Sequence, residues 1–152
     1  MTPFSTKIAS EILSDFPKWK DFAKEEPDKG GSTFFLIEVP APLGSNADHD
    51  LIIETENDEV TVSFDYYHSH FDSWHVEVEG REDLAARTFV DGLFEESIFV
   101  ASWWEGKAWQ GSCQTHQGEM PTFGIPRDFD RIRIRSWHGN LNEDQYFPKE
   151  KP

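Results

Sequence analysis

Apolar residues recur every three to four positions near the start of the chain, which is the period of an α-helix. They are Phe4, Ile8, Ile12, Phe16 and Trp19. Because Pro17 interrupts the hydrogen bonds of a continuous helix, the pattern predicts one helix from Phe4 to about Ser14 and a further turn or two to Lys24. The residues that follow, with Pro27 and two glycines, predict a loop.

Six later segments are apolar runs or alternate between apolar and polar residues, as β-strands do. They are Thr33–Val39, Leu51–Thr55, Val60–Tyr67, Ile98–Trp104, Lys107–Cys113 and Arg131–Trp137, with Trp74–Val78 as a shorter candidate. Polar turns after the second and the fourth segment predict two hairpins. In the third segment the even positions are apolar or aromatic, so we expect the odd positions Asp65 and Tyr67 to face solvent.

A central helix is predicted for Arg81–Glu96. Glu82 and Asp83 fall in its first turn, where the helix dipole favours acidic side chains. The apolar stripe expected along this helix consists of Leu84, Phe89 or Thr88, Leu93 and Phe94.

The order of these segments is helix, strands, helix, strands. It predicts an α+β fold with a largely antiparallel sheet of about five to six strands, on which the N-terminal and the central helix pack. We expect a single domain over residues 1–139 and a frayed polar tail over residues 140–152.

Acidic residues are concentrated in the middle of the chain. The net charge is −15, and the stretch from Gly30 to Gly80 holds eleven carboxylates but no lysine or arginine. Such a field repels phosphate backbones and anionic lipids, and it attracts basic proteins. We therefore expect a basic protein as partner, and neither nucleic acid nor membrane.

The remaining composition favours a cytoplasmic protein without a cofactor. No apolar run approaches the roughly 20 residues that span a bilayer, and the first residues lack the pattern of a secretion signal. Cys113 is the only cysteine, so the chain cannot form an internal disulfide or a zinc site of several thiolates.

One cluster of residues has the chemistry of a metal site. His68, His70 and Asp72 project to the same face of an extended strand, and two histidines with a carboxylate can form part of a metal site. The chain has no HExxH, GxSxG or phosphate-binding glycine motif that would point to catalysis. A small metal-dependent enzyme using these three residues is therefore the alternative reading.

Arginines and tryptophans mark the C-terminal strands. Arg131, Arg133 and Arg135 share one face of their strand, where they are expected to pair with carboxylates such as Glu54 or Glu56; a phosphate-binding stripe is the alternative.

The neighbouring residues Trp103 and Trp104 point to opposite sides of a strand, so one of them is exposed unless both faces of the sheet are covered. Trp109 and Trp137 lie in the other two C-terminal strands. An exposed tryptophan ringed by acids is typical of a binding hot spot, and packing in the core is the alternative.

The segment Glu59–Trp74, EVTVSFDYYHSHFDSW, resembles a group of small bacterial immunity proteins. These proteins accompany polymorphic toxins, including those of contact-dependent growth inhibition systems. The resemblance implies that the chain is not an enzyme, and that it binds one cognate, basic nuclease-type toxin domain and occludes its active or substrate-binding surface.

Combining the resemblance with the charge pattern, we expect the partner to contact acidic and aromatic residues of the central region. The expected contact residues are Asp65, Tyr67, Asp72, Trp74, Glu77 and Glu79.

Overall fold

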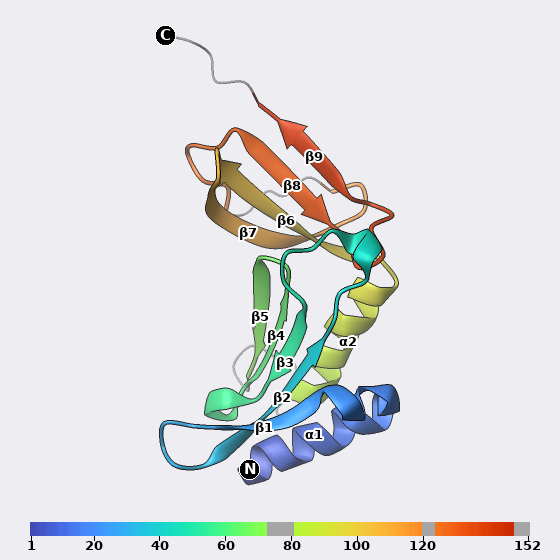
Figure 1. The fold of residues 1–152 in the computed structure, drawn as a ribbon, viewed down its shortest axis with the longest axis vertical. Coiled ribbons are helices and arrows are strands. Elements are labelled where there is room, and N and C mark those ends of the chain that lie inside the picture. The colour runs from blue at the N-terminus through green and yellow to red at the C-terminus, as the bar shows by residue number, and fades with distance from the viewer. Residues whose placement is uncertain (73–80, 120–123, 148–152) are drawn as a thin grey trace. The chain divides into compact units, whose positions relative to one another are not determined.

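The computed structural model describes residues 1–72, 81–119 and 124–147 (Figure 1). The predicted strand Trp74–Val78 and the predicted contact residues Trp74, Glu77 and Glu79 lie outside this range. The chain forms two compact units, where the sequence indicated one domain over residues 1–139. Unit 1 comprises Met1–Pro40, Asp50–Phe64 and His68–Asp91, and unit 2 comprises Ala41–His49, Asp65–Tyr67 and Gly92–Pro152.

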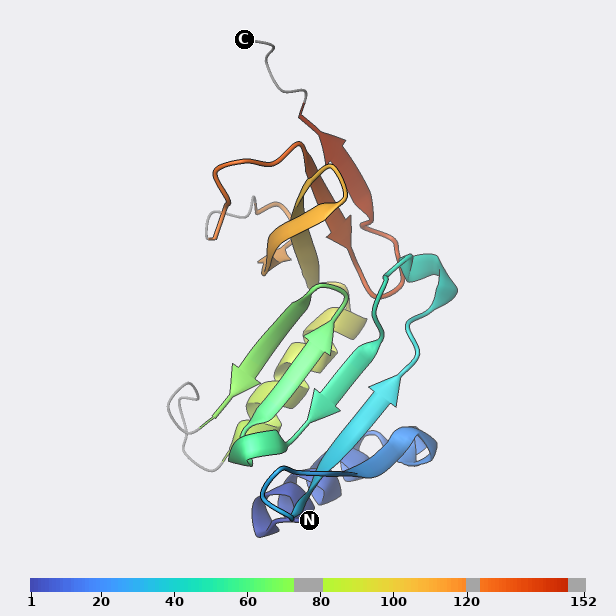
Figure 2. The same cartoon turned by 60° about the vertical axis from the view of Figure 1, so that its left-hand side comes forward.

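Unit 1 is built on a five-stranded antiparallel sheet, sheet A, with the strand order β1-β2-β3-β4-β5 (Figure 2). Its strands are β1 (Ala23–Pro27), β2 (Thr33–Val39), β3 (Leu51–Glu54), β4 (Val60–Phe64) and β5 (Tyr67–Phe71). Helix α1 (Pro3–Asp15) contacts β2. Helix α2 (Glu82–Phe94) lies behind the strands in the view of Figure 2, so one face of sheet A is covered.

Alternation along the strands of sheet A builds the core of unit 1. Every second side chain of β2, β3 and β4 points toward the helices and is buried. The buried strand residues are Phe35, Ile37, Val39, Leu51, Ile53, Val60, Val62 and Phe64. From the helices, Ile8, Ile12, Phe89 and Val90 are also buried.

Helix α1 begins at a cap that the sequence encodes. The hydroxyl of Thr2 accepts a hydrogen bond from the Ser5 backbone N–H at 3.1 Å. Pro3 occupies the first turn, where its missing N–H costs nothing. The short 3₁₀ helix Pro17–Phe22 then follows, as the proline at that position predicted.

Unit 2 is built on a four-stranded antiparallel sheet, sheet B, with the order β7-β6-β8-β9. Its strands are β6 (Ile98–Glu105), β7 (Ala108–His116), β8 (Arg131–Arg135) and β9 (Glu143–Tyr146). On one face of sheet B, Ala101, Trp103 and Ile132 form a small core.

The α+β class, the antiparallel pairing and the two helices are thus confirmed, with the strands divided between two sheets. Two short strands were missed. Residues 143–146 pair with β8 as strand β9, so the predicted frayed tail is wrong for these residues. Strand β1 pairs with β2 although its sequence, AKEEP, is polar. Both are edge strands, which bury little and therefore show no apolar pattern.

The prediction of one long strand over Val60–Tyr67 is wrong. Strand β4 ends at Phe64, and a two-residue turn leads into β5, the next strand of sheet A. Asp65 begins this turn with a φ of 50°, a left-handed conformation that aspartate tolerates better than most residues. The turn reverses the chain and moves Asp65 off the solvent-facing side of the strand.

The predicted apolar stripe of the central helix needs one correction. Leu84 is 45% exposed, whereas Ala86, Phe89, Val90 and Leu93 are buried. No helix in the described parts of the chain is long and apolar enough to cross a lipid bilayer.

The same substitution at two positions of α2 tests this assignment. Leu93→Ala removes a fully buried side chain and should lower the free energy of unfolding by about 2–5 kcal/mol. Leu84→Ala should change it by no more than about 0.5 kcal/mol, because that side chain is half exposed. Urea denaturation of both variants decides the matter, and a larger loss for Leu84→Ala would contradict the packing described.

Candidate functional sites

The face of sheet A that α1 and α2 leave uncovered is the first candidate site. Its strand register brings the outward side chains into cross-strand rows. We call this surface the open face, and it consists of Lys24, Glu26, Phe34, Leu36, Glu38, Ile52, Glu54, Thr61, Ser63, His68 and His70. Leu36 and Ile52 are half-buried at its middle, so the open face has a small apolar centre.

Three carboxylates, those of Glu26, Glu38 and Glu54, lie around that centre. The one lysine of the open face, Lys24, lies 3.3 Å from Glu26 and 3.7 Å from Glu38. Glu54 stands opposite Leu36 on one side and Thr61 on the other. In the described parts of the chain, no lysine or arginine forms an ion pair with Glu54.

The surroundings of Glu54 disfavour the charged form of its carboxyl group. Burial raises the pKa of its carboxyl, and the negative charges of Glu56 and Glu59 raise it further. The charges of His70 and His68 act in the opposite direction but do not cancel the effect. A half-buried carboxylate crowded by like charges is a position where an added cation would be stabilised.

The two histidines of the predicted metal cluster lie together on this face. Their rings are 4.9 Å apart in an edge-to-face arrangement. Nδ1 of His70 is already engaged, at 2.9 Å from Glu59 Oε1 and 3.0 Å from Thr61 Oγ1. Within residues 1–72, 81–119 and 124–147, no group of three or more His, Cys, Asp or Glu side chains is placed to hold a metal ion.

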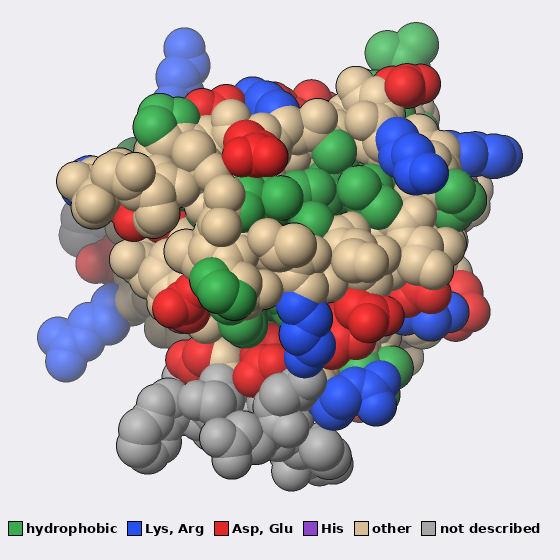
Figure 3. All heavy atoms as spheres, turned by 90° about the horizontal axis from the view of Figure 1, so that it is seen from below, with side chains coloured by type: hydrophobic (Ala, Val, Ile, Leu, Met, Phe, Trp, Pro, Cys, Tyr) green, Lys and Arg blue, Asp and Glu red, His purple; other side chains and the backbone are tan. Residues whose placement is uncertain are grey.

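The surface around α1 and β1 has a different character. Figure 3 shows the molecule from below, with hydrophobic side chains in the middle and both basic and acidic side chains around them. In unit 1, a hollow of about 290 Å³ is lined mainly by apolar residues of α1 and the first two strands, among them Ala9, Leu13 and Phe35. The mixed charges seen in Figure 3 contrast with the acidic rim of the open face.

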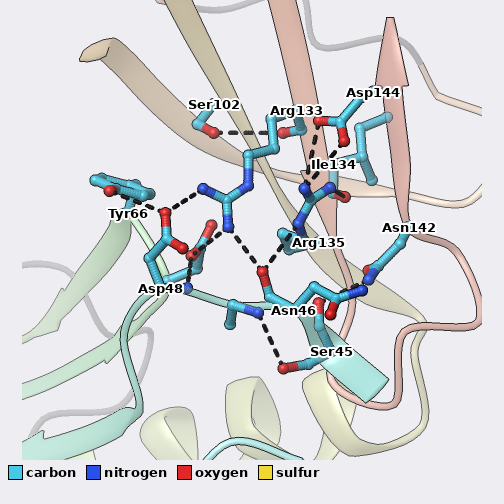
Figure 4. Close-up of polar contacts among 12 residues, drawn as sticks. Ser45, Asn46, Asp48, Tyr66, Ser102, Arg133, Ile134, Arg135, Asn142 and Asp144 are labelled. Atoms are coloured by element: carbon cyan, nitrogen blue, oxygen red, sulfur yellow. Dashed lines mark hydrogen bonds and ion pairs between the residues drawn. The ribbon is translucent and has the colours of Figure 1, made fainter. Parts of the chain in front are cut away.

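The second candidate site is a buried charge cluster in unit 2, centred on Arg133 (Figure 4). The Arg133 guanidinium donates hydrogen bonds to Asp48 Oδ2, to the Asn46 carbonyl at 2.8 Å and to Asp65 Oδ1 at 3.4 Å. The Asp48 backbone N–H donates to Asp65 Oδ1 at 2.8 Å, and Tyr66 donates its hydroxyl to Asp48. These bonds fasten the loop 41–49 and the turn 65–66 to one face of sheet B.

The cluster shifts the pKa values of its members in opposite directions. The hydrogen bond from Arg133 lowers the pKa of Asp48, whose side chain is half exposed. Burial raises the pKa of Asp65, whose side chain is fully buried, and this outweighs the stabilising hydrogen bond from Asp48 and the charge of Arg133. Asp65 Oδ2 and Arg133 Nε are buried without a hydrogen-bond partner, so the pairing is incomplete.

Aromatic rings surround the Arg133 cluster. Tyr66 packs edge-on against Trp104 and His49, with centroids 4.8 Å apart in each case, and lies 6.2 Å from Trp109. Trp104 is buried and Trp109 is 49% exposed. The Arg131 guanidinium lies 5.1 Å from the centre of the Trp104 ring, where a cation–π contact stabilises both groups.

Several predicted contact residues take other roles. Asp65 is 5% exposed and bound within the Arg133 cluster, so its predicted position on a solvent face is wrong. Tyr67 and Asp72 lie in the part of the chain that the structure describes, and both are half-buried. Trp103 and Trp104 are both buried, because each side of sheet B is covered at that point, and Trp137 is buried as well.

The predicted ion pairs of the arginine row exist, but with other partners. Arg133 pairs with Asp48 and Asp65, and Arg135 pairs with Asp144 at 3.1 Å, instead of with Glu54 or Glu56. These pairs favour the charged ladder over the phosphate-binding stripe. The sequence did not single out Asp48, since only the fold brings it to Arg133, 85 positions away.

No protein-family model matches this chain, and neither the curated proteins nor the solved structures contain a significant match.

Matched substitutions in the arginine row test the buried cluster. Arg133→Met leaves Asp65 buried and without its cation, which should cost about 3–5 kcal/mol of unfolding free energy. Arg131→Met removes a partly exposed cation–π contact and should cost about 0.5–1 kcal/mol.

The loss caused by Arg133→Met should also depend on pH. Without Arg133 the folded-state pKa of Asp65 rises further above its ordinary value of 3.8, so the folded variant loses stability as the pH rises above that value. Asp48 meanwhile loses the lowered pKa that stabilises the parent protein above pH 4. Both effects make the deficit larger at pH 7 than at pH 4.5, and urea titrations at the two values should show it. Equal deficits would contradict the assignment.

Proposed function

We propose that this chain is an immunity protein that binds and neutralises a cognate bacterial toxin domain, a basic nuclease, in the cytoplasm. In this proposal the chain performs no chemistry of its own. It covers the surface with which the toxin holds its substrate. The observation that carries the proposal is the open face of sheet A. Its apolar centre is surrounded by carboxylates, and among the described residues Lys24 is the one lysine that pairs with them.

The distribution of charge supports a basic partner. Unit 1 contains 18 of the 29 acidic residues and seven of the 14 basic ones, a formal charge of −11 out of the total of −15. A nuclease needs lysines and arginines to hold the phosphates of its substrate. A carboxylate surface can occupy those same cations, and long-range attraction would speed the encounter.

The apolar centre of the open face supports a protein as the bound molecule. Carboxylates at the rim of an interface mainly steer association and add little affinity when they remain hydrated. Leu36 and Ile52 can be desolvated by a partner, and Glu54 is already half-buried beside them. Such an arrangement of an apolar core within a polar rim is the usual anatomy of a protein interface.

The charge of Glu54 should have opposite effects on the stability of the free protein and on binding of the partner. Its carboxylate is crowded by Glu56 and Glu59, so its charge destabilises the free protein. Because the folded-state pKa is raised, this penalty grows as the pH rises through the region above 4.5. We propose that the charge is kept because it pairs with a cation of the partner.

The substitution Glu54→Gln tests this directly. It should leave the unfolding free energy unchanged or raise it slightly at pH 7, while it weakens binding of the partner about tenfold or more. The probe is the C-terminal domain encoded by the gene immediately upstream, made catalytically inactive, and calorimetry gives the dissociation constant. Glu11→Gln on the exposed side of α1 is the matched control and should change binding less than about twofold.

Two further results would count against the proposal. A dissociation constant that stays the same between low and high salt would remove the electrostatic part. Absence of binding to the upstream domain would remove the proposal as a whole, and a stoichiometric transition metal in the untagged protein would favour the enzyme reading instead.

A further inference from the structure

In the described parts of the chain the two sheets end in four edge strands, which differ in how they are protected. Natural proteins guard exposed edge strands with charged residues, proline or short length, because unpaired backbone groups invite another strand. Strand β1 carries Lys24, Glu25, Glu26 and Pro27, and β9 has four residues of which two are acidic. β5, at the other edge of sheet A, has five residues including two histidines.

The edge strand β7 (Ala108–His116) has no charged residue and no proline, and it is not short. It is nine residues long, AWQGSCQTH, and contains no lysine, arginine, aspartate, glutamate or proline. In a chain with 28% charged residues, a neutral strand of this length at a sheet edge is a clear exception. Five of its nine residues are exposed and one is buried.

The outer edge of β7 carries backbone N–H and C=O groups that do not pair with β6. The strand pairs with β6 and ends sheet B on that side. Among the described residues, one backbone–backbone hydrogen bond of β7 lies outside this pairing, and it runs from the Glu119 N–H to the His116 carbonyl at the end of the strand. An irregularity in the β6–β7 register leaves Gln110 unpaired, but residues 111–116 continue in regular register, so alternate residues of this run turn their backbone groups to an edge that no strand in the described parts of the chain occupies.

We propose that the outer edge of β7 accepts an extended strand of the partner protein, which lengthens sheet B from four strands to five. Main-chain hydrogen bonds would supply affinity with little demand on sequence, and the 49% exposed Trp109 at the start of β7 would pack against the added strand. This inference rests on the proposed function, because it assigns a second contact to the same partner.

Charge argues for a basic partner over a second copy of this chain as the occupant. Each copy carries −15, and unit 2 alone is −4, with eleven acidic and seven basic residues. Pairing two copies through β7 would bring like charges together, whereas a basic domain would meet attraction.

Residue-resolved amide hydrogen exchange, measured by NMR, tests the inference with the inactive upstream domain as probe. In an edge strand alternate N–H groups point away from the sheet. In the free protein the alternate amides of residues 111–116 should exchange fast, and in the complex their exchange should slow at least tenfold.

The outcomes separate this inference from the proposed function. Binding with slowed exchange at β7 supports both. Binding with unchanged exchange at β7 overturns the inference and leaves the proposed function standing, and absence of binding overturns both. Outward amides that are already protected in the free protein, in a manner that depends on concentration, would show that a second copy occupies the edge and would also overturn the inference.

A pair of lysine substitutions gives an independent readout. Gln114→Lys places a charged guard on β7, and Gln145→Lys makes the same charge change on β9, at the opposite edge of sheet B. Gln114→Lys should weaken binding about tenfold and Gln145→Lys less than about twofold. Equal effects of the two changes would mean that only the overall field matters, which would contradict strand addition at β7.

Discussion

The alternation of side chains along sheet A is the constraint on which the rest of unit 1 depends. One face must be apolar because α1 and α2 cover it, and it holds eight buried strand residues from β2, β3 and β4. The charged residues of the same strands therefore have only the other face to occupy. An apolar core on one side and a crowded set of carboxylates on the other thus arise from one pattern, and a shift of register by one residue would destroy both.

In unit 2 a different interaction has the corresponding role. Arg133 gathers Asp48, Asp65 and the Asn46 carbonyl onto one face of sheet B, and the loop and turn that carry these groups depend on it. A buried ion pair gives little net stability, but it fixes one arrangement, because any other would leave a charge unpaired. Since Asp65 Oδ2 and Arg133 Nε lack partners, this arrangement is strained even in its present form.

The sequence predicted the elements that carry a strong period and missed those that do not. Strand β2 matched its predicted bounds, and α2 was found within two residues at each end, because both have apolar faces that must be buried. The turn at Asp65 was missed because Tyr66 and Tyr67 fit an extended pattern equally well, and the bonds that favour the turn come from Asp48 and Arg133, which are distant in sequence. For the same reason the open face was only half predicted. The acidity of Glu38 and Glu54 is visible in the chain, but their placement around Leu36 and Ile52 follows from strand register.

The central claim is that the open face is the surface that binds a basic partner. Methyl NMR on the protein labelled at leucine and isoleucine, with the inactive upstream domain added, measures this most directly. We expect intermolecular contacts and shifted signals for Leu36 and Ile52, while Ile8 and Ile12 on the buried side of α1 change little. Intermolecular contacts at α1 without any at Leu36 and Ile52 would contradict the account.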